Sequence, residues 1–266
     1  MKQGLSDREL RLEAGQLYKQ ARRALDSSDF SNAITRYDQL QTKYPFSDYA
    51  TQAQLEEIYA RYRNFDADEA VSGADRFLKE HPRHPEVQYV YYIRGLVNFQ
   101  RGDSLFDSLP FYDPTKPDVG YARKSFDDFA LLIQRYPDSQ YGGDARQRMV
   151  YLRNRLAQHD MGIVRFYLKR GAWLAAAKRC EDIIAQYPGA PATDEALQYL
   201  EHAYREMGMK AQADDARRVL AANQLKPLES ADSAPEIKPN TKPEDVNPPA
   251  LQPQPERDES AVPNPG

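Results

Sequence analysis

The sequence has few of the residues that build covalent or metal-dependent chemistry. Cys180 is the only cysteine among 266 residues, which excludes an intramolecular disulfide and a multi-thiolate zinc site. The four histidines are His81, His84, His159 and His202, and no two have the i, i+4 spacing of a metal-binding helix. A glycine-rich phosphate loop is also absent. We therefore expect a protein that is not an enzyme and that holds no metal and no cofactor.

The sequence also lacks long apolar runs and a strong overall charge. No run reaches the roughly 18 apolar residues of a transmembrane helix, and the start, MKQGLSDREL, has no apolar signal core. The formal net charge is −4, and residues 224–266 account for all of it with eight acidic and four basic residues. The preceding 223 residues are therefore neutral overall, so no global field attracts nucleic acid or a membrane.

The C-terminal stretch 224–266 has no aromatic residue, although it holds ten of the nineteen prolines. Such a segment cannot bury enough apolar surface to offset the entropy of ordering, so the composition predicts a disordered, acidic tail. A solvated spacer is the favoured interpretation, and a proline-rich binding ligand is the alternative.

A packing pattern recurs four times in the rest of the chain, each time before a proline. The prolines are Pro45, Pro82, Pro137 and Pro188, and each follows a tyrosine or a histidine. Twelve, eight and five residues before each proline stand residues that share one side of a helix: Ala33, Tyr37, Leu40; Ala70, Ala74, Phe77; Ser125, Phe129, Leu132; Ala176, Cys180, Ile183. Because proline cannot continue a helix, each copy carries its own stop.

These copies predict an array of paired helices. The predicted helices span about 9–27, 29–44, 47–62, 68–80, 85–101, 139–158, 160–170, 172–186, 193–207 and 209–223, with a further helix over the pattern residues before Pro137. The helices on either side of Asp160 to Gly162 could form one kinked helix. Pro45 and Pro82 are 37 residues apart, close to the roughly 34 of a tetratricopeptide repeat. We predict an all-α solenoid of about five such hairpins over residues 10–223, after a flexible stretch 1–9. Solenoids of this kind hold extended peptides or other domains.

Two departures from the repeat are candidates for function. The third unit is 55 residues long, and its excess is the loop 102–120, which has three prolines and five large apolar residues. We expect this loop to pack on its own chain, with packing on a partner as the alternative.

The second departure is a cluster of basic residues in the fourth unit. Residues 145–180 hold nine basic residues against Asp160 alone. A solvated face, an acidic protein partner and RNA all remain open as explanations. Arg179 flanks the apolar side of helix 172–186, a position suited to a desolvated pair with a partner carboxylate. Its neighbour Cys180 has a core position, which predicts an inert buried thiol.

Several stretches resemble the BamD family of outer-membrane lipoproteins, which belong to the bacterial β-barrel assembly machinery. They include YPFSDYATQAQLEEIYARYRN, HPEVQYVYYIRGL, the loop FDSLPFYDPTKPDVGYARKSFDDF, RYPDSQYGGDARQRMVYLRNRLAQHD and RGAWLAAAKRCEDIIAQYP. The resemblance covers about residues 15 to 223. It implies five tetratricopeptide repeats that join BamA through its last POTRA domain, bind the other Bam lipoproteins, and receive unfolded outer-membrane β-barrel proteins by their C-terminal signals. No nucleic acid partner is implied.

The resemblance also implies a location and particular residues. Family members lie at the periplasmic face of the outer membrane, anchored by an N-terminal lipid, and the anchor cysteine is absent from this sequence. In the family an arginine after the RGAW motif pairs with a POTRA carboxylate. Arg179 matches it, and Arg170 and Lys178 are further candidates for the same contact. The substrate side in the N-terminal repeats corresponds to Tyr37, Tyr44, Phe46 and Tyr62, which could equally be repeat-core residues. A repeat adaptor in another envelope assembly, for division or cell-wall synthesis, is the alternative function.

Overall fold

The structure, a computed structural model, describes residues 7–102, 119–225 and 248–249. These ranges contain ten helices and no strand, so the prediction of an all-α fold is confirmed. The helices are α1 (Asp7–Asp26), α2 (Phe30–Lys43), α3 (Ala50–Arg63), α4 (Ala67–Glu80), α5 (Val87–Gly102), α6 (Gly120–Arg135), α7 (Gly142–Lys169), α8 (Trp173–Gln186), α9 (Ala192–Glu206) and α10 (Lys210–Leu225).

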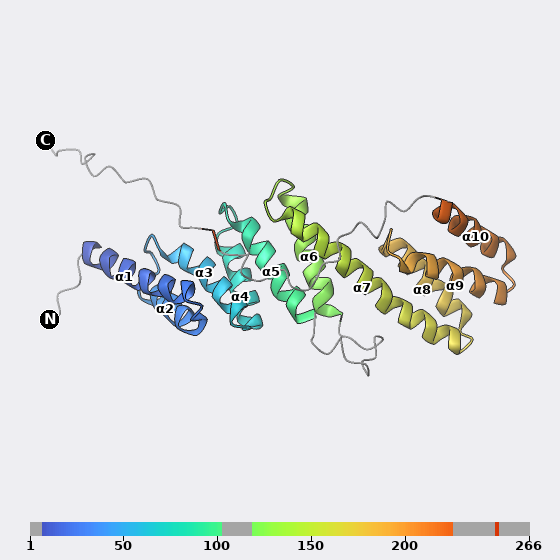
Figure 1. The fold of residues 1–266 in the computed structure, drawn as a ribbon, viewed down its shortest axis with the longest axis horizontal. Coiled ribbons are helices and arrows are strands. Elements are labelled where there is room, and N and C mark those ends of the chain that lie inside the picture. Colours follow the sequence, from blue (N-terminus) through green and yellow to red (C-terminus); the bar gives the residue numbers. More distant parts are fainter. Residues whose placement is uncertain (1–6, 103–118, 226–247, 250–266) are drawn as a thin grey trace.

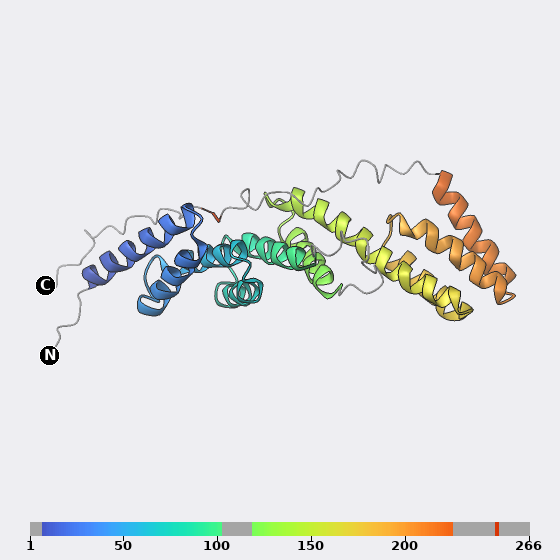
Figure 2. The same ribbon diagram turned by 60° about the horizontal axis from the view of Figure 1, so that its bottom comes forward.

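The helices form an elongated array in which neighbours in sequence are neighbours in space (Figure 1). Each helix packs against the next, and α3 with α5 and α7 with α9 make further contacts across successive hairpins. Figure 2 shows the same order from another side, with α1 and α10 at opposite ends. The result is a stack of five hairpins, α1–α2 through α9–α10, which runs from left to right in Figure 1, as a solenoid requires.

The residues of the recurring sequence pattern form the buried contacts between the helices of this solenoid. All twelve pattern residues are at most 1% exposed. The tyrosine or histidine before each proline ends its helix, and its N–H donates to the carbonyl of the last pattern residue over 2.8–3.0 Å. These four C-terminal residues are Tyr44, His81, Tyr136 and Tyr187. The same residues therefore fill the core and stop the helix.

The turns inside the hairpins share one geometry. Ser28, Phe65, Gly171 and Gly208 all have positive φ, between 61° and 73°. The N–H of the residue after each donates to a carbonyl five positions back, at 2.8–3.1 Å. This left-handed closure satisfies the last carbonyls of α1, α3, α7 and α9 and turns the chain into the next helix.

Helix α7 decides between the two predictions made for its region. It runs without a break from Gly142 to Lys169, 28 residues, so the segments on either side of Asp160 to Gly162 form one helix, and the alternative of two separate helices is wrong. Asp160 lies inside the helix and is buried because its carboxylate has partners: the Tyr187 hydroxyl donates to it over 2.9 Å, and Arg123 lies 3.6 Å away. An aspartate with tertiary partners does not have to end a helix.

The two other boundary regions differ less from prediction. Helix α1 begins at Asp7, and α10 ends at Leu225, two residues beyond the predicted end of the array. The loop predicted at 102–120 lies outside the described residues except at its edges, and so does the C-terminal tail apart from Pro248 and Pro249. The packing predicted for that loop therefore stays a prediction.

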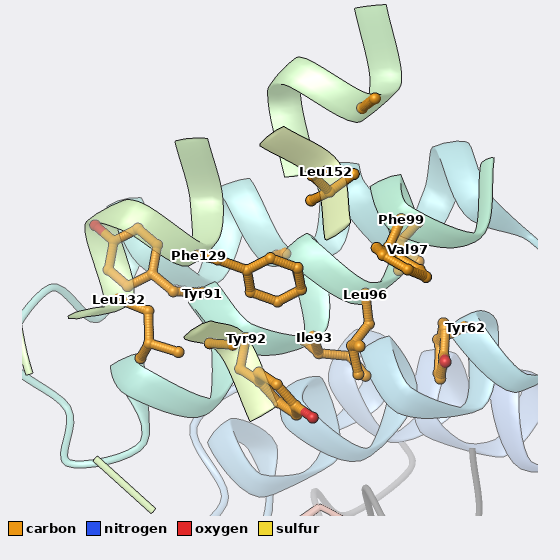
Figure 3. Close-up of a cluster of buried hydrophobic side chains, with 14 of the residues drawn as sticks. Tyr62, Tyr91, Tyr92, Ile93, Leu96, Val97, Phe99, Phe129, Leu132 and Leu152 are labelled. Atoms are coloured by element: carbon orange, nitrogen blue, oxygen red, sulfur yellow. The ribbon is translucent and has the colours of Figure 1, made fainter. Parts of the chain in front are cut away.

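One cluster of buried apolar side chains contains residues of α5, α6 and α7 (Figure 3). Ile93, Leu96, Phe129 and Leu152 are each at most 2% exposed. The Phe129 ring lies directly on Gly95: a Cβ at that glycine would be 2.6 Å from the ring. Glycine at this position therefore sets how closely α5 and α6 approach.

Candidate partner-binding surfaces

One candidate surface lies at the junction of α7 and α8. We call Phe166, Arg170, Leu174, Lys178 and Arg179 the α7–α8 surface. Leu174 is 73% exposed and Phe166 is 48% exposed, although both are large and apolar. The Arg170 guanidinium lies 4.2 Å from the centre of the Phe166 ring, a cation–π contact that holds its charge beside apolar surface. The surface thus combines apolar side chains with cations, as many protein interfaces do.

Arg179 is the most available cation of the α7–α8 surface. Its side chain is exposed and makes no hydrogen bond or ion pair with any residue that the structure describes. Lys178, beside it, lies 3.3 Å from the Glu181 carboxylate. Arg179 is thus a solvated guanidinium next to the core residue Cys180, and a partner carboxylate could reach it without displacing an existing pair.

Cys180 itself is inaccessible. The residue is fully buried, and this burial, with smaller effects from Glu181 and Glu195, raises the pKa of the thiol to about 12. The thiol is therefore protonated at neutral pH and cannot act as a nucleophile in this conformation.

The nine basic residues of 145–180 do not form one patch. Arg148 is 5% exposed, donates to Asp144 over 2.6 Å and lies over the Phe99 ring. Arg165 forms a bidentate contact with Glu195 at 2.8 Å. Arg146 and Arg153 donate to backbone carbonyls of the loops at 137 and 188–189. The cations left for a partner are Lys169, Arg170, Lys178 and Arg179. This dispersal weakens the RNA-binding interpretation.

The N-terminal hairpins contain a buried carboxylate that the sequence did not reveal as important. Glu56 on α3 is fully buried, and its Oε1 accepts from the Tyr18 hydroxyl at 2.8 Å, Arg22 at 2.9 Å and Gln52 at 2.9 Å. Its Oε2 accepts from the Tyr37 hydroxyl at 2.5 Å. Burial, and then the Glu56 charge, raise the pKa of both tyrosines far above the usual value, so both stay donors. The cluster ties α1, α2 and α3 together.

The four residues predicted to line a substrate groove are not gathered in one. Tyr37 has no exposed surface and Tyr62 is 8% exposed, so both are core residues and the groove prediction is wrong for them. Tyr44 and Phe46 lie on the connection between α2 and α3. The Tyr44 hydroxyl donates to Glu13 over 2.5 Å, a bond that raises its pKa, and Phe46 is 99% exposed. Only these two present rings at the surface.

Two kinds of residue were missed from the sequence because their polarity differs from that of the helix side on which they lie. Leu174 is a large apolar residue off the apolar side of α8, and it is exposed. Glu56 and Glu57 are adjacent acids in α3, a helix that is buried on almost all sides. A charge inside such a helix implies a buried partner, which here is the cluster around Glu56.

Comparison with known proteins places the chain. The YfiO family, described as "Outer membrane lipoprotein", matches residues 11–219, which include both surfaces described above. The chain belongs to this family. Family proteins named "Outer membrane protein assembly factor BamD" are similar over most of their length. The one from Neisseria meningitidis serogroup A is 39% identical over 207 residues, 78% of each chain, and the one from Vibrio cholerae is 36% identical over 213 residues, covering 80% of this chain and 87% of the relative.

Among solved structures, a tetratricopeptide repeat protein from Parabacteroides merdae covers 79% of both chains at 14% identity, with a TM-score of 0.41. Within the described residues, no helix of this family member is both long and apolar enough to cross a membrane. The same residues contain no cluster of histidine, cysteine and acidic side chains with the arrangement of a metal site.

Proposed function

We propose that the chain is a non-catalytic scaffold and substrate receptor in the assembly of β-barrel proteins into the bacterial outer membrane. Its membership of the outer-membrane lipoprotein family carries this proposal, because relatives that match about 80% of the chain are named outer membrane protein assembly factors. The fold supports it as well: an elongated array of hairpins offers separated surfaces to several partners at once.

The α7–α8 surface is the proposed contact with the BamA POTRA domain. Arg179 supplies an exposed guanidinium without a partner among the described residues, and Leu174 and Phe166 supply exposed apolar area on the same two helices. Arg170, over the Phe166 ring, and Lys178 add positive charge on these helices. An arginine next to apolar anchors is a frequent centre of binding energy at interfaces, because the surrounding contacts exclude water from the charge pair.

The N-terminal hairpins are the proposed receptor for unfolded β-barrel proteins and their C-terminal signals. Phe46 and the Tyr44 ring are available there, while Tyr37 and Tyr62 build the supporting core. The other Bam lipoproteins are further proposed partners. We place the protein at the periplasmic face of the outer membrane, with an N-terminal lipid as its anchor. The helical array is the proposed partner-binding part of the chain.

The Arg179→Glu variant tests the POTRA contact. Reversing one charge of a desolvated pair costs about 2–5 kcal/mol, a loss of roughly thirty-fold or more in affinity. The measurement is a calorimetric titration with the isolated last POTRA domain, with circular dichroism to show that helix content is unchanged. Arg83→Glu is the matched control, because Arg83 is exposed, has no described partner and lies between α4 and α5. Equal affinities of the wild type and Arg179→Glu would remove Arg179 from the interface.

A further inference from the structure

A short C-terminal segment lies against α3, in the N-terminal half of the solenoid and far from α10 (Figures 1 and 2). Gln52 Nε2, on α3, donates a 2.8 Å hydrogen bond to the carbonyl oxygen of Pro249, which is 197 residues away in sequence. Pro248 is buried. Figures 1 and 2 both place this segment beside the N-terminal helices, whereas α10 closes the far end. A tail that was only a solvated spacer would not bury a proline there.

The Gln52 side chain is held in place for this contact. Its Nε2 also donates to Glu56 Oε1 at 2.9 Å, and that carboxylate is fixed by Tyr18, Arg22 and Tyr37. With one amide N–H directed at Glu56, the other is directed at the Pro249 carbonyl. A donor that is already oriented loses little entropy when a ligand binds.

The chemistry of the site suits a proline-containing strand. Consecutive prolines have no N–H and hold an extended backbone at low entropic cost, so such a segment presents carbonyl acceptors and flat rings. The site offers a matching amide donor. Tyr49 begins α3 one turn before Gln52, and its ring stacks on Tyr18 at 5.1 Å. Aromatic rings beside a hydrogen-bond donor are a common arrangement for binding proline-rich segments.

We propose that Pro248 and Pro249 are an intramolecular ligand of the α1–α3 face, and that they block this face to other extended polypeptides. Residues 226–247 provide up to about 75 Å of extended chain between α10 and this segment. Since the same hairpins are the proposed receptor for unfolded substrates, the blocking role rests on the proposed function. The docking itself does not.

Paramagnetic relaxation in the full chain tests the docking. A nitroxide label on Ala250→Cys, in a Cys180→Ser background, should cause loss of amide signal intensity in α1 and α3 and none in α9. Gln52→Met keeps the side-chain length without the donor and should abolish this loss. Gln54→Met, on the same helix but bonded to Glu80 and His81, is the control and should preserve it. The proposal is overturned if the labelled parent chain shows no loss of signal in α1 and α3, or if the loss persists in the Gln52→Met variant. It is also overturned if the signal loss arises only between a labelled copy and a separate unlabelled copy of the chain, because the docking would then be intermolecular.

A binding experiment tests the blocking role. A fluorescent peptide with a C-terminal β-barrel signal should bind more tightly to the Pro248→Gly/Pro249→Gly chain than to the parent. Equal affinities would overturn the blocking role. If no version of the chain binds the peptide, the proposed receptor function fails, while the relaxation experiment still decides whether the tail docks.

Discussion

Phe65 occupies a backbone position that the other described turns of this kind give to serine or glycine. Its φ is +63°, in the left-handed region, and the side chain is 75% exposed. The left-handed conformation costs a residue with a Cβ about 1–2 kcal/mol, and little burial compensates for it here. A strained, exposed aromatic residue on the N-terminal hairpins is therefore a candidate contact for a bound segment.

The Phe65→Gly variant should be more stable than the wild type. Relief of backbone strain exceeds the added entropy of a glycine in the unfolded chain, so the free energy of unfolding should rise by about 0.5–1 kcal/mol. Urea denaturation measures it. The opposite change at the equivalent turn, Gly208→Ala at φ +73°, should lower the free energy of unfolding by about 1 kcal/mol. Destabilisation by Phe65→Gly would show that the ring packs on its neighbours in spite of its exposure.

His84 should make stability depend on pH. Burial, and then the nearby His81, lower its pKa below the usual 6.5, and its Nδ1 accepts the Glu86 N–H at 3.2 Å. The folded state thus binds a proton less readily than the unfolded state. Stability is highest above pH 6.5 and falls as the pH drops from 6.5 to the lowered pKa. His84→Gln should flatten the dependence of the melting temperature on pH in this window, and an unchanged slope would exclude His84 as the cause.

Some properties of single residues could not be predicted from the sequence. The spacing before each proline predicted that Tyr37 faces the interior, yet the same ring was a candidate for a groove. Both roles need an aromatic residue, and only the neighbouring helices α1 and α3 decide between them. Glu56 was not distinguishable from a surface acid, because its four donors come from positions 4 to 38 residues away.

At the scale of the elements, the contact of α5 with α6 depends on Gly95, which has no side chain. Ser125 Oγ donates to the Gly95 carbonyl at 2.9 Å, and the Phe129 ring fills the space where a Cβ would stand. The two helices cannot separate without breaking the hydrogen bond, and they cannot stay in place if a methyl group is added.

Gly95→Ala should therefore destabilise the protein although alanine favours helix. Overpacking against a buried ring costs about 1–3 kcal/mol, and the gain in helix propensity of about 1 kcal/mol offsets part of it. Thermal unfolding followed by circular dichroism measures the change. Gly143→Ala is the control, because that glycine is also helical and a Cβ there meets nothing within 4 Å, so this variant should be slightly more stable. A stabilised Gly95→Ala would contradict the close packing.

The helices themselves were largely predictable, since proline, capping residues and core spacing are local signals. The helices predicted at 29–44, 68–80 and 172–186 agree with α2, α4 and α8 to within one residue at each end. The sequence left open whether α7 is one helix or two, because the contacts of Tyr187 and Arg123 with Asp160 come from other parts of the chain.

For the whole molecule, the order of contacts determines how stability is distributed. Since each helix packs mainly on its neighbours in sequence, a disturbance at one end has no direct contact through which to reach the other. Opening of α9 and α10 should thus be separable from opening of α1 to α4.

Leu200→Ala tests this separation. Leu200 lies on α9 and is 7% exposed, so truncation should cost about 2–4 kcal/mol locally. Hydrogen exchange should show faster exchange of backbone amides in α8, α9 and α10, with rates in α1 to α4 as in the wild type. Equally faster exchange along the whole chain would mean that the array unfolds as one unit. Leu12→Ala, at a 59% exposed position on α1, is the control and should leave both ends unchanged.

The unbroken helix α7 has a mechanical consequence for an assembly built on this chain. Its 28 residues make a rod about 42 Å long, and it contacts α6, α8 and α9. A continuous helix without a kink moves as a rigid body and does not bend at an internal hinge. If a partner tilts the α7–α8 surface, a rigid α7 should carry that motion to α6, so that docking on the fourth hairpin should reorient the hairpin next to it.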